Sequence, residues 1–346
     1  MIGIIGSLSG CIASRPQQSL GEHLVDRMQT VSTSAEQMPA PTSEPSSGPS
    51  DLRSFAFELR DNLVTMPVVV NGHTITGVLD SGSGSTLVDR GVSREIGLFE
   101  EGEAGEALGG GTEAQAFSNV TIDDFLFGPV RLTHVSGYAF DLGHLTSSAG
   151  FPVELVVGAP VLEKGAVRID YGARQITFAA SGALDACEFP ISFELIHDVP
   201  VVKIQLRTRQ DTAPVDLKVM VDLGSRGGAL NLGGPFLRTS IGEAFLAAGH
   251  SAKVGHGVGG EVHGIVAESD ELRVGGLVFT DLRTQLTSQI PAFEAGLFDG
   301  TLGVPLWQNG KVTFDYPARQ LCIEPVAADV SLPSNNIGLR GSDRRR

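Results

Sequence analysis

The sequence predicts an all-β, or mainly β, protein that contains two copies of one structural unit. Glycine is abundant, at 44 of 346 residues, and charged residues make up only 19% of the chain; this composition favours strands joined by tight turns over long surface helices. Runs of alternating polar and apolar residues recur along both halves, while helical periodicity is limited to short segments such as residues 241–248. The length agrees with two units, because a domain has roughly 150 residues.

The two copies are most easily compared near their ends. Residues 170–175 read Asp-Tyr-Gly-Ala-Arg-Gln and residues 315–320 read Asp-Tyr-Pro-Ala-Arg-Gln, so five of the six positions are identical at an offset of 145 residues. Upstream of them, the glycines of Gly158-Ala-Pro and Gly303-Val-Pro are separated by the same 145 residues. Two motifs at one constant offset indicate a duplicated fold.

The duplication divides the chain into four parts. Residues 51–180 and 188–327 are predicted to form two similar β lobes, and residues 328–346 form a polar tail that ends in three arginines. Residues 1–50 are expected to form a signal-like or lipobox-like segment followed by a disordered linker, because residues 12–50 are rich in Ser, Pro, Gln and Thr and cannot build a core.

Each lobe also contains a strand-like run that ends in Asp-x-Gly-Ser. These motifs begin at Asp80 and Asp222. An isolated motif of this kind is an ordinary turn, but matched positions in a repeat can bring two carboxylates together across a pseudo-twofold axis. Two carboxyls that share a site keep one proton between them, because two like charges cannot both form cheaply. Such a pair can activate a water molecule and polarise a carbonyl group.

The residues that follow each aspartate are expected to support this pair. Glycine two positions on lets backbone N–H groups approach the carboxylates, and the next serine offers a further donor. The predicted supporting residues are Ser81, Gly82, Ser83, Gly224 and Ser225. Asp170 and Asp315, by contrast, precede Tyr in a strand-turn-strand element and are predicted to cap turns.

The motif at Asp80, the apolar run 154–158 and the strand pair around residues 170–171, all repeated in the second half, resemble the retropepsin-like aspartyl protease family. The chain is similar to a fused, two-lobed bacterial form, and the resemblance covers about residues 51–327. It implies two closed β-barrel lobes of acid-protease type with short helices, and an active-site cleft between them. It also implies an aspartic endopeptidase that hydrolyses peptide bonds, with Asp80 and Asp222 as its catalytic residues.

Glycine-rich segments in each lobe are similar to the flaps that fold over a bound peptide in this family. Glycine supplies the positive φ angles of a hairpin tip, and strand-like alternation flanks both segments. The residues implied in substrate binding are Gly109, Gly110, Gly111, Gly257, Gly259 and Gly260.

The second lobe departs from the family pattern at Leu223. The family usually has Thr or Ser after the catalytic aspartate, and its hydroxyl bonds across to the other lobe. Ser81 can make this bond and Leu223 cannot. A second function therefore stays open, that of a catalytically degenerate protein that binds extended peptides in its cleft without cutting them.

Several other classes of function are disfavoured. The formal net charge of −15 argues against nucleic acid and acidic lipid surfaces as partners. Residues 255–260 fit the pattern G-x-G-x-x-G, but a strand-like run follows where a dinucleotide site needs a helix. The histidines of the same region lack the spacing of a metal site, so we expect neither a metal nor a cofactor. We expect a monomer whose partner is a peptide or protein substrate; the sequence does not predict its specificity.

The cysteines bear on where in the cell the protein is located. Leu8-Ser-Gly-Cys11 resembles a bacterial lipobox, which predicts lipidation at Cys11, a membrane anchor and export to the cell envelope. The alternative is a disordered N-terminus without a role in export. Cys187 and Cys322 would pair in an exported protein, or they are buried free thiols; both interpretations stay open.

Overall fold

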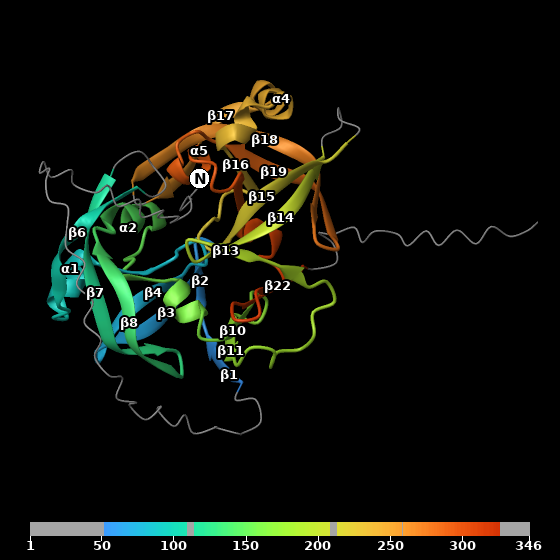
Figure 1. Cartoon of the computed structure of the whole chain (residues 1–346). Coiled ribbons are helices and arrows are strands. Elements are labelled where there is room, and N and C mark those ends of the chain that lie inside the picture. The colour runs from blue at the N-terminus through green and yellow to red at the C-terminus, as the bar shows by residue number, and fades with distance from the viewer. Residues whose placement is uncertain (1–51, 109–113, 208–212, 258, 326–346) are drawn as a thin grey trace, which may run out of the picture.

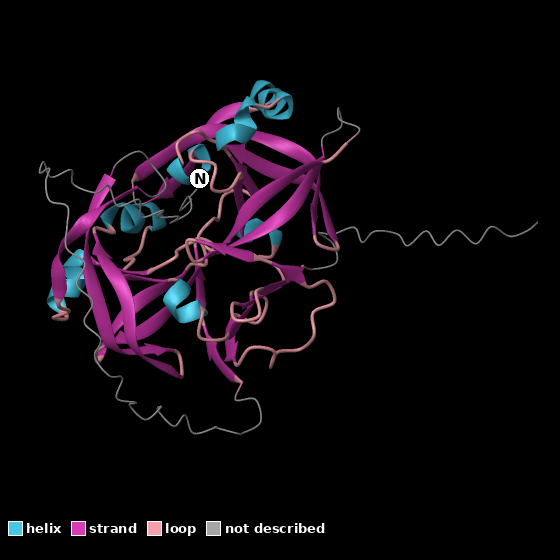
Figure 2. Cartoon of the chain, viewed as in Figure 1, coloured by secondary structure: helices cyan, strands magenta, loops and turns pink. Residues whose placement is uncertain are grey.

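The computed structural model describes residues 52–108, 114–207, 213–257 and 259–325, and these residues are mainly β (Figures 1 and 2). Two eight-stranded sheets each contain strands from one half of the chain, and a six-stranded sheet joins strands from both halves. We call the halves the first and second lobe. The predicted fold class, a mainly β protein with short helices, is confirmed.

The first lobe forms a sheet with the strand order β2-β3-β4-β9-β5-β8-β7-β6. An additional pairing of β3 with β7 links the sheet back onto itself. Its strands are β2 (Glu58–Arg60), β3 (Leu63–Val70), β4 (His73–Leu79), β5 (Thr86–Asp89), β6 (Glu100–Leu108), β7 (Ala114–Phe127), β8 (Val130–Phe140) and β9 (Leu155–Val157).

The second lobe repeats this order strand for strand, as β13-β14-β15-β20-β16-β19-β18-β17, and β14 pairs with β18 as β3 does with β7. Its strands are β13 (Glu194–Ile196), β14 (Val199–Arg207), β15 (Val215–Asp222), β16 (Leu230–Leu232), β17 (His250–Gly257), β18 (Gly260–Val274), β19 (Leu277–Leu286) and β20 (Gly300–Gly303). The sequence repeat is therefore a repeat of topology.

The six-stranded sheet has the order β1-β11-β10-β21-β22-β12. Its strands are β1 (Arg53–Ala56), β10 (Ala166–Asp170), β11 (Gln175–Ala179), β12 (Ile191–Ser192), β21 (Lys311–Asp315) and β22 (Gln320–Glu324). In the antiparallel pairing of β10 with β21, Arg168 lies opposite Thr313. These two residues are themselves 145 positions apart, so each lies opposite its own copy and the pseudo-twofold axis passes between them.

The helices are short. They are α1 (Arg90–Glu95), α2 (Gly143–Ala149), α3 (Ala159–Leu162), α4 (Ser240–Ala248), α5 (Pro291–Glu294) and the 3₁₀ helices η1 (Gly234–Arg238) and η2 (Val304–Leu306). Asp89 begins α1 by accepting hydrogen bonds from two backbone N–H groups, and Thr239 caps α4, the helix expected at residues 241–248. Within the described ranges, no helix is long and apolar enough to cross a bilayer.

One large apolar core runs through both lobes and the six-stranded sheet. The repeat is visible even in its aromatic pairs: Phe57 meets Tyr171 edge to face at 5.9 Å, and Phe193 meets Tyr316 in the same way at 5.5 Å. Trp307 Nε1 of the second lobe donates to the Tyr171 hydroxyl at 3.3 Å. Because burial of aromatic surface dominates core energetics, this shared core ties the two lobes together.

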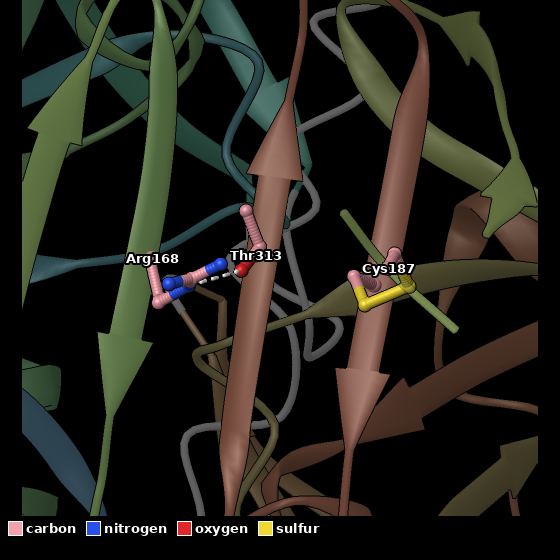
Figure 3. Close-up of a disulfide and its surroundings, with 4 residues drawn as sticks. Arg168, Cys187 and Thr313 are labelled. Atoms are coloured by element: carbon pink, nitrogen blue, oxygen red, sulfur yellow. Dashed lines mark hydrogen bonds between the residues drawn. A yellow bond between two sulfur atoms is a disulfide. The ribbon is translucent and has the colours of Figure 1, made fainter. Parts of the chain in front are cut away.

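A disulfide joins the connection between the lobes to β22 (Figure 3). Cys187 and Cys322, which the sequence left as a pair or as free thiols, are bonded, with their Cα atoms 5.8 Å apart. The figure also shows Arg168 donating to Thr313 on the neighbouring strands.

The two Asp-Tyr turns have the predicted capping role. Asp170 Oδ1 accepts a hydrogen bond from Ala173 N at 2.8 Å, and Asp315 Oδ1 accepts one from Ala318 N at 3.0 Å. This local chemistry accounts for the conserved spacing between the copies, since an Asx turn needs the carboxylate at a fixed distance from the amide.

Candidate active site

The two Asp-x-Gly-Ser motifs lie at equivalent strand ends. Asp80 follows β4, which runs parallel to β9, and Asp222 ends β15, which runs parallel to β20. In each lobe the motif's serine carbonyl accepts a hydrogen bond from the residue after the repeated glycine. Ala159 N donates to Ser83 O at 2.9 Å, and Val304 N donates to Ser225 O at 2.7 Å.

The repeated glycines allow this contact. A Cβ atom at Gly158 would come within 2.7 Å of Ser83 O, and one at Gly303 within 2.6 Å of Ser225 O. Only glycine lets the backbone approach so closely, because any side chain would push the aspartate loop away. The Gly-x-Pro motif of the repeat therefore seats the loop that carries each aspartate.

The structure brings Asp80 and Asp222 together. Both side chains are fully buried, and the two carboxyls lie close enough for the protonation of one to affect the other. Gly82 N donates to Asp80 Oδ1 at 2.8 Å, and Gly224 N donates to Asp222 Oδ1 at 2.8 Å. Ser225 N adds a third bond of 3.1 Å to Asp222 Oδ1. Among the described residues no donor reaches the Oδ2 atom of either aspartate, which leaves these atoms for the shared proton.

The glycines of the motifs lie against the opposite carboxylates. A Cβ atom at Gly82 would be 2.6 Å from Asp222 Cγ, and one at Gly224 would be 2.6 Å from Asp80 Oδ2. Each lobe thus contributes the glycine that makes room for the other lobe's carboxylate.

The pKa values of both carboxyls are raised. Burial raises the pKa of Asp80, while the hydrogen bonds from Asp222 and from the amides of Gly82 and Gly224 oppose that rise. Burial also raises the pKa of Asp222, to well above the ordinary range of an aspartate, and the negative charge of Asp80 raises it further. The two carboxyls therefore titrate as one coupled pair that shares a proton.

Ser81 connects the lobes beneath the pair. Its hydroxyl donates to Val221 O at 2.8 Å and accepts from Leu223 N at 3.1 Å. The Leu223 side chain is fully buried in the large core, where it returns no such bond. The brace across the dyad is therefore made from one lobe, by a hydroxyl that holds the backbone on both sides of Asp222.

The hydroxyls of the motif serines do not extend this network to the carboxylates, contrary to the expectation that each serine offers a further donor. Ser83 Oγ donates to Ser85 O at 2.7 Å, and Ser225 Oγ accepts from Asn231 Nδ2 at 2.8 Å. Each hydroxyl is directed into its own loop because a nearer backbone or amide partner is present there. Ser225 supports Asp222 through its backbone N–H alone.

The predicted flap glycines are only partly described. Gly257 pairs with Gly260 at the end of the β17–β18 hairpin, and Gly260 has a φ of 101°, which favours glycine. Gly259 lies between them. Gly109, Gly110 and Gly111 lie outside the described residues.

Sequence reasoning missed Arg226, which lies four residues after Asp222. Its side chain is buried, and its guanidinium forms an ion pair with Asp61 of the first lobe. The equivalent position in the first lobe is Gly84, four residues after Asp80. This difference between the two copies, an arginine in one and a glycine in the other, is the feature of the sequence that could have indicated a special role for Arg226.

One family model matches part of the first lobe. Residues 66–161 match the family model described as aspartyl protease, and the match includes Asp80 and Gly158. A crystal structure of a retropepsin-like aspartic protease from Rickettsia conorii is also similar, at 16% identity and a TM-score of 0.26, over 38% of this chain and 93% of that one. No curated protein matches the chain. The predicted resemblance to aspartyl proteases is confirmed over residues 66–161 of the first lobe.

Proposed function

We propose that the protein is an aspartic endopeptidase in which Asp80 and Asp222 share one proton and activate one water molecule. One observation carries the proposal: two buried carboxyls, 142 residues apart in the sequence, lie together at the ends of equivalent strands, each against the motif glycine of the other lobe. The aspartyl protease match of the first lobe supports a peptidase in general.

In the proposed chemistry the two carboxyls have different roles, with Asp80 as the base and Asp222 as the acid. Asp80 takes a proton from the water, whose oxygen forms a bond to the carbon of the scissile amide. Asp222 gives its proton to the carbonyl oxygen, so that a neutral geminal diol results. In the second step the carbon–nitrogen bond breaks, the amine nitrogen takes the proton held by Asp80, and Asp222 recovers its proton from the diol. No covalent intermediate with the protein is formed.

The alternative, peptide binding without cleavage, rests on Leu223. The bonds of Ser81 to Val221 O and Leu223 N favour the catalytic proposal, because they hold the backbone on both sides of Asp222 without a second hydroxyl.

The test is cleavage of a denatured protein mixture by the purified full chain between about pH 3 and 8, a range that spans the titration of the pair. Asp80→Ala and Asp222→Ala remove one carboxyl each, and Asp170→Asn is the matched control, because this aspartate caps a turn and pairs with Lys311 in the six-stranded sheet. We expect cleavage by the wild type and the control alone. Cleavage that survives both dyad substitutions would refute the proposal, and tight peptide binding without turnover at any pH would favour the alternative.

We also propose an extracytoplasmic location, with the chain anchored through Cys11 as a lipoprotein of a bacterial cell envelope. The Cys187–Cys322 disulfide supports an oxidising compartment, where such bonds persist. Cys11 itself lies outside the described residues. Fractionation of cells that express the full chain tests the anchor: Cys11→Ala should move the protein from the membrane to the soluble fraction, and an unchanged distribution would contradict it.

A further inference from the structure

We propose that Arg226 is a positioning residue that holds the catalytic loop of the second lobe against the first lobe. This inference rests on the proposed function, since it concerns the geometry of the same dyad. It extends that function by naming the contact that compensates for the leucine at position 223.

Arg226 reaches two separate elements of the first lobe. Its Nη1 donates to the main-chain oxygen of Asp61 at 3.1 Å and also bonds the Asp61 carboxylate, and its Nη2 donates to Ser148 Oγ at 3.2 Å. Asp61 lies in the turn between β2 and β3, and Ser148 lies in α2. The guanidinium has a planar, forked set of donors, so one side chain can fix the loop in two directions.

The arginine side chain is completely buried, whereas Asp61 is 43% exposed. Burial lowers the pKa of Arg226 to about 10, and the charge of Asp61 opposes that shift, so the guanidinium is charged over the whole pH range in which a dyad works. A buried cation without its partner is strongly unfavourable. Moving the loop away from the Asp61 turn would leave the buried guanidinium without its counter-ion. This free-energy penalty holds the loop against the turn.

The equivalent contact in the first lobe is built differently. The second lobe has a matching turn at His197 and Asp198, and both turns place two successive residues at positive φ. The carbonyl oxygen of His197 lies so close to Gly84 that no Cβ atom fits there. The first-lobe loop thus packs directly on the backbone of His197 in the second lobe. The second-lobe loop contacts the first lobe through the side chain of Arg226 instead.

Together with Ser81, Arg226 holds both ends of the second-lobe loop. Ser81 bonds the backbone at Val221 and Leu223, and Arg226 fixes the chain three residues later. Asp222 lies between these attachments. Val304 N and Asn231 hold Ser225 within the second lobe, but without Arg226 this end of the loop would lose these bonds to the first lobe, and Asp222 would move relative to Asp80.

The test compares Arg226→Met, Arg226→Lys and Asp61→Asn with a matched control, Arg168→Met. Arg168 also connects the lobes, through Thr313 in the six-stranded sheet, but lies in a sheet rather than in a dyad loop (Figure 3). Two properties are measured on the full chain: the titration of the dyad carboxyls by ¹³C NMR, and kcat and KM on a peptide that the wild type cleaves.

We expect Arg226→Met to lower the higher of the two apparent pKa values of the dyad by about one unit or more, because separated carboxyls share a proton less strongly. Loss of the positive charge by itself would raise both pKa values. The direction of the pKa change therefore distinguishes displacement of the carboxyls from a direct effect of the lost charge. The kcat should fall about 10- to 100-fold with KM within about twofold, as for a catalytic group displaced by about 1 Å. Arg226→Lys and Asp61→Asn should give smaller changes in the same direction, and Arg168→Met neither change.

The inference is overturned if Arg226→Met titrates like the wild type and Arg168→Met, whether or not the protein cleaves peptides. If the wild type cleaves nothing while the titration still shifts, the proposed function fails and the positioning role stands. Should Arg226→Met not fold, Asp61→Asn and Arg226→Lys decide: unchanged titration and kcat in both would refute the role.

Discussion

Replacing Ser81 by alanine removes the only side chain that braces the dyad from within the motif. Two bonds are lost, the donor to Val221 O and the acceptor for Leu223 N. The Leu223 residue is fully buried, so its N–H would stay without a partner, at a cost of about 1–3 kcal/mol, and the lost bond to Val221 adds about 1 kcal/mol. We therefore expect Ser81→Ala to lower the free energy of unfolding by about 2–4 kcal/mol.

Urea unfolding followed by tryptophan fluorescence measures this change, since Trp307 is buried in the core that both lobes share. Ser83→Ala is the matched control, because its hydroxyl bonds only the carbonyl of Ser85 within the same loop, and its loss should cost about 1 kcal/mol. If Ser81→Ala costs no more than Ser83→Ala, the hydroxyl does not brace the lobes. Ser81→Thr, which keeps the hydroxyl, should retain most of the stability.

Three further predictions follow from the same contacts. Gly224→Ala should abolish cleavage in the peptide assay, because its Cβ would lie 2.6 Å from Asp80 Oδ2, whereas Gly172→Ala, where the nearest atom is 3.4 Å away, should cleave normally. The raised pKa of Asp222 means that the folded protein holds a proton that the unfolded chain releases above its ordinary aspartate pKa, so stability falls as pH rises from about 4. Asp222→Asn should therefore melt at a higher temperature than the wild type at pH 7 and lose this advantage below about pH 4; an equal gain at both pH values would contradict the shift. Cys322→Ala should lower the free energy of unfolding by about 2–5 kcal/mol under oxidising conditions and by much less under reducing conditions, because the disulfide closes a loop across a separation of 135 residues.

Features with local causes were predictable from the sequence. Asp170 and Asp315 cap their turns through amides three residues away, and such turn chemistry depends on neighbours in the chain. The helix at residues 241–248 was visible from its periodicity. The equivalence of Asp80 and Asp222 followed from the repeat, since two copies of one sequence fold in the same way and place equivalent residues at equivalent strand ends.

Apart from the Ser81 bond across to the second lobe, which the family resemblance implied, tertiary contacts were not predictable. The sequence offered a hydroxyl at Ser83 as a donor to the dyad, but the path of the loop places Ser85 O nearer. The pairing of Cys187 with Cys322 stayed open for the same reason, because composition does not say which of two distant segments lie side by side.

The sequence by itself determined the β class, the duplication and the two aspartates, because each depends on local propensity or on similarity within the chain. Only the tertiary structure decided that the Ser81 hydroxyl bonds the backbone on both sides of Asp222, that Arg226 reaches Asp61, and that both carboxyls are buried with raised pKa values. These features depend on which atoms of one lobe meet the other and on how far water is excluded from them. Such distances and burial are properties of the packed lobes, and no pattern of neighbouring residues encodes them.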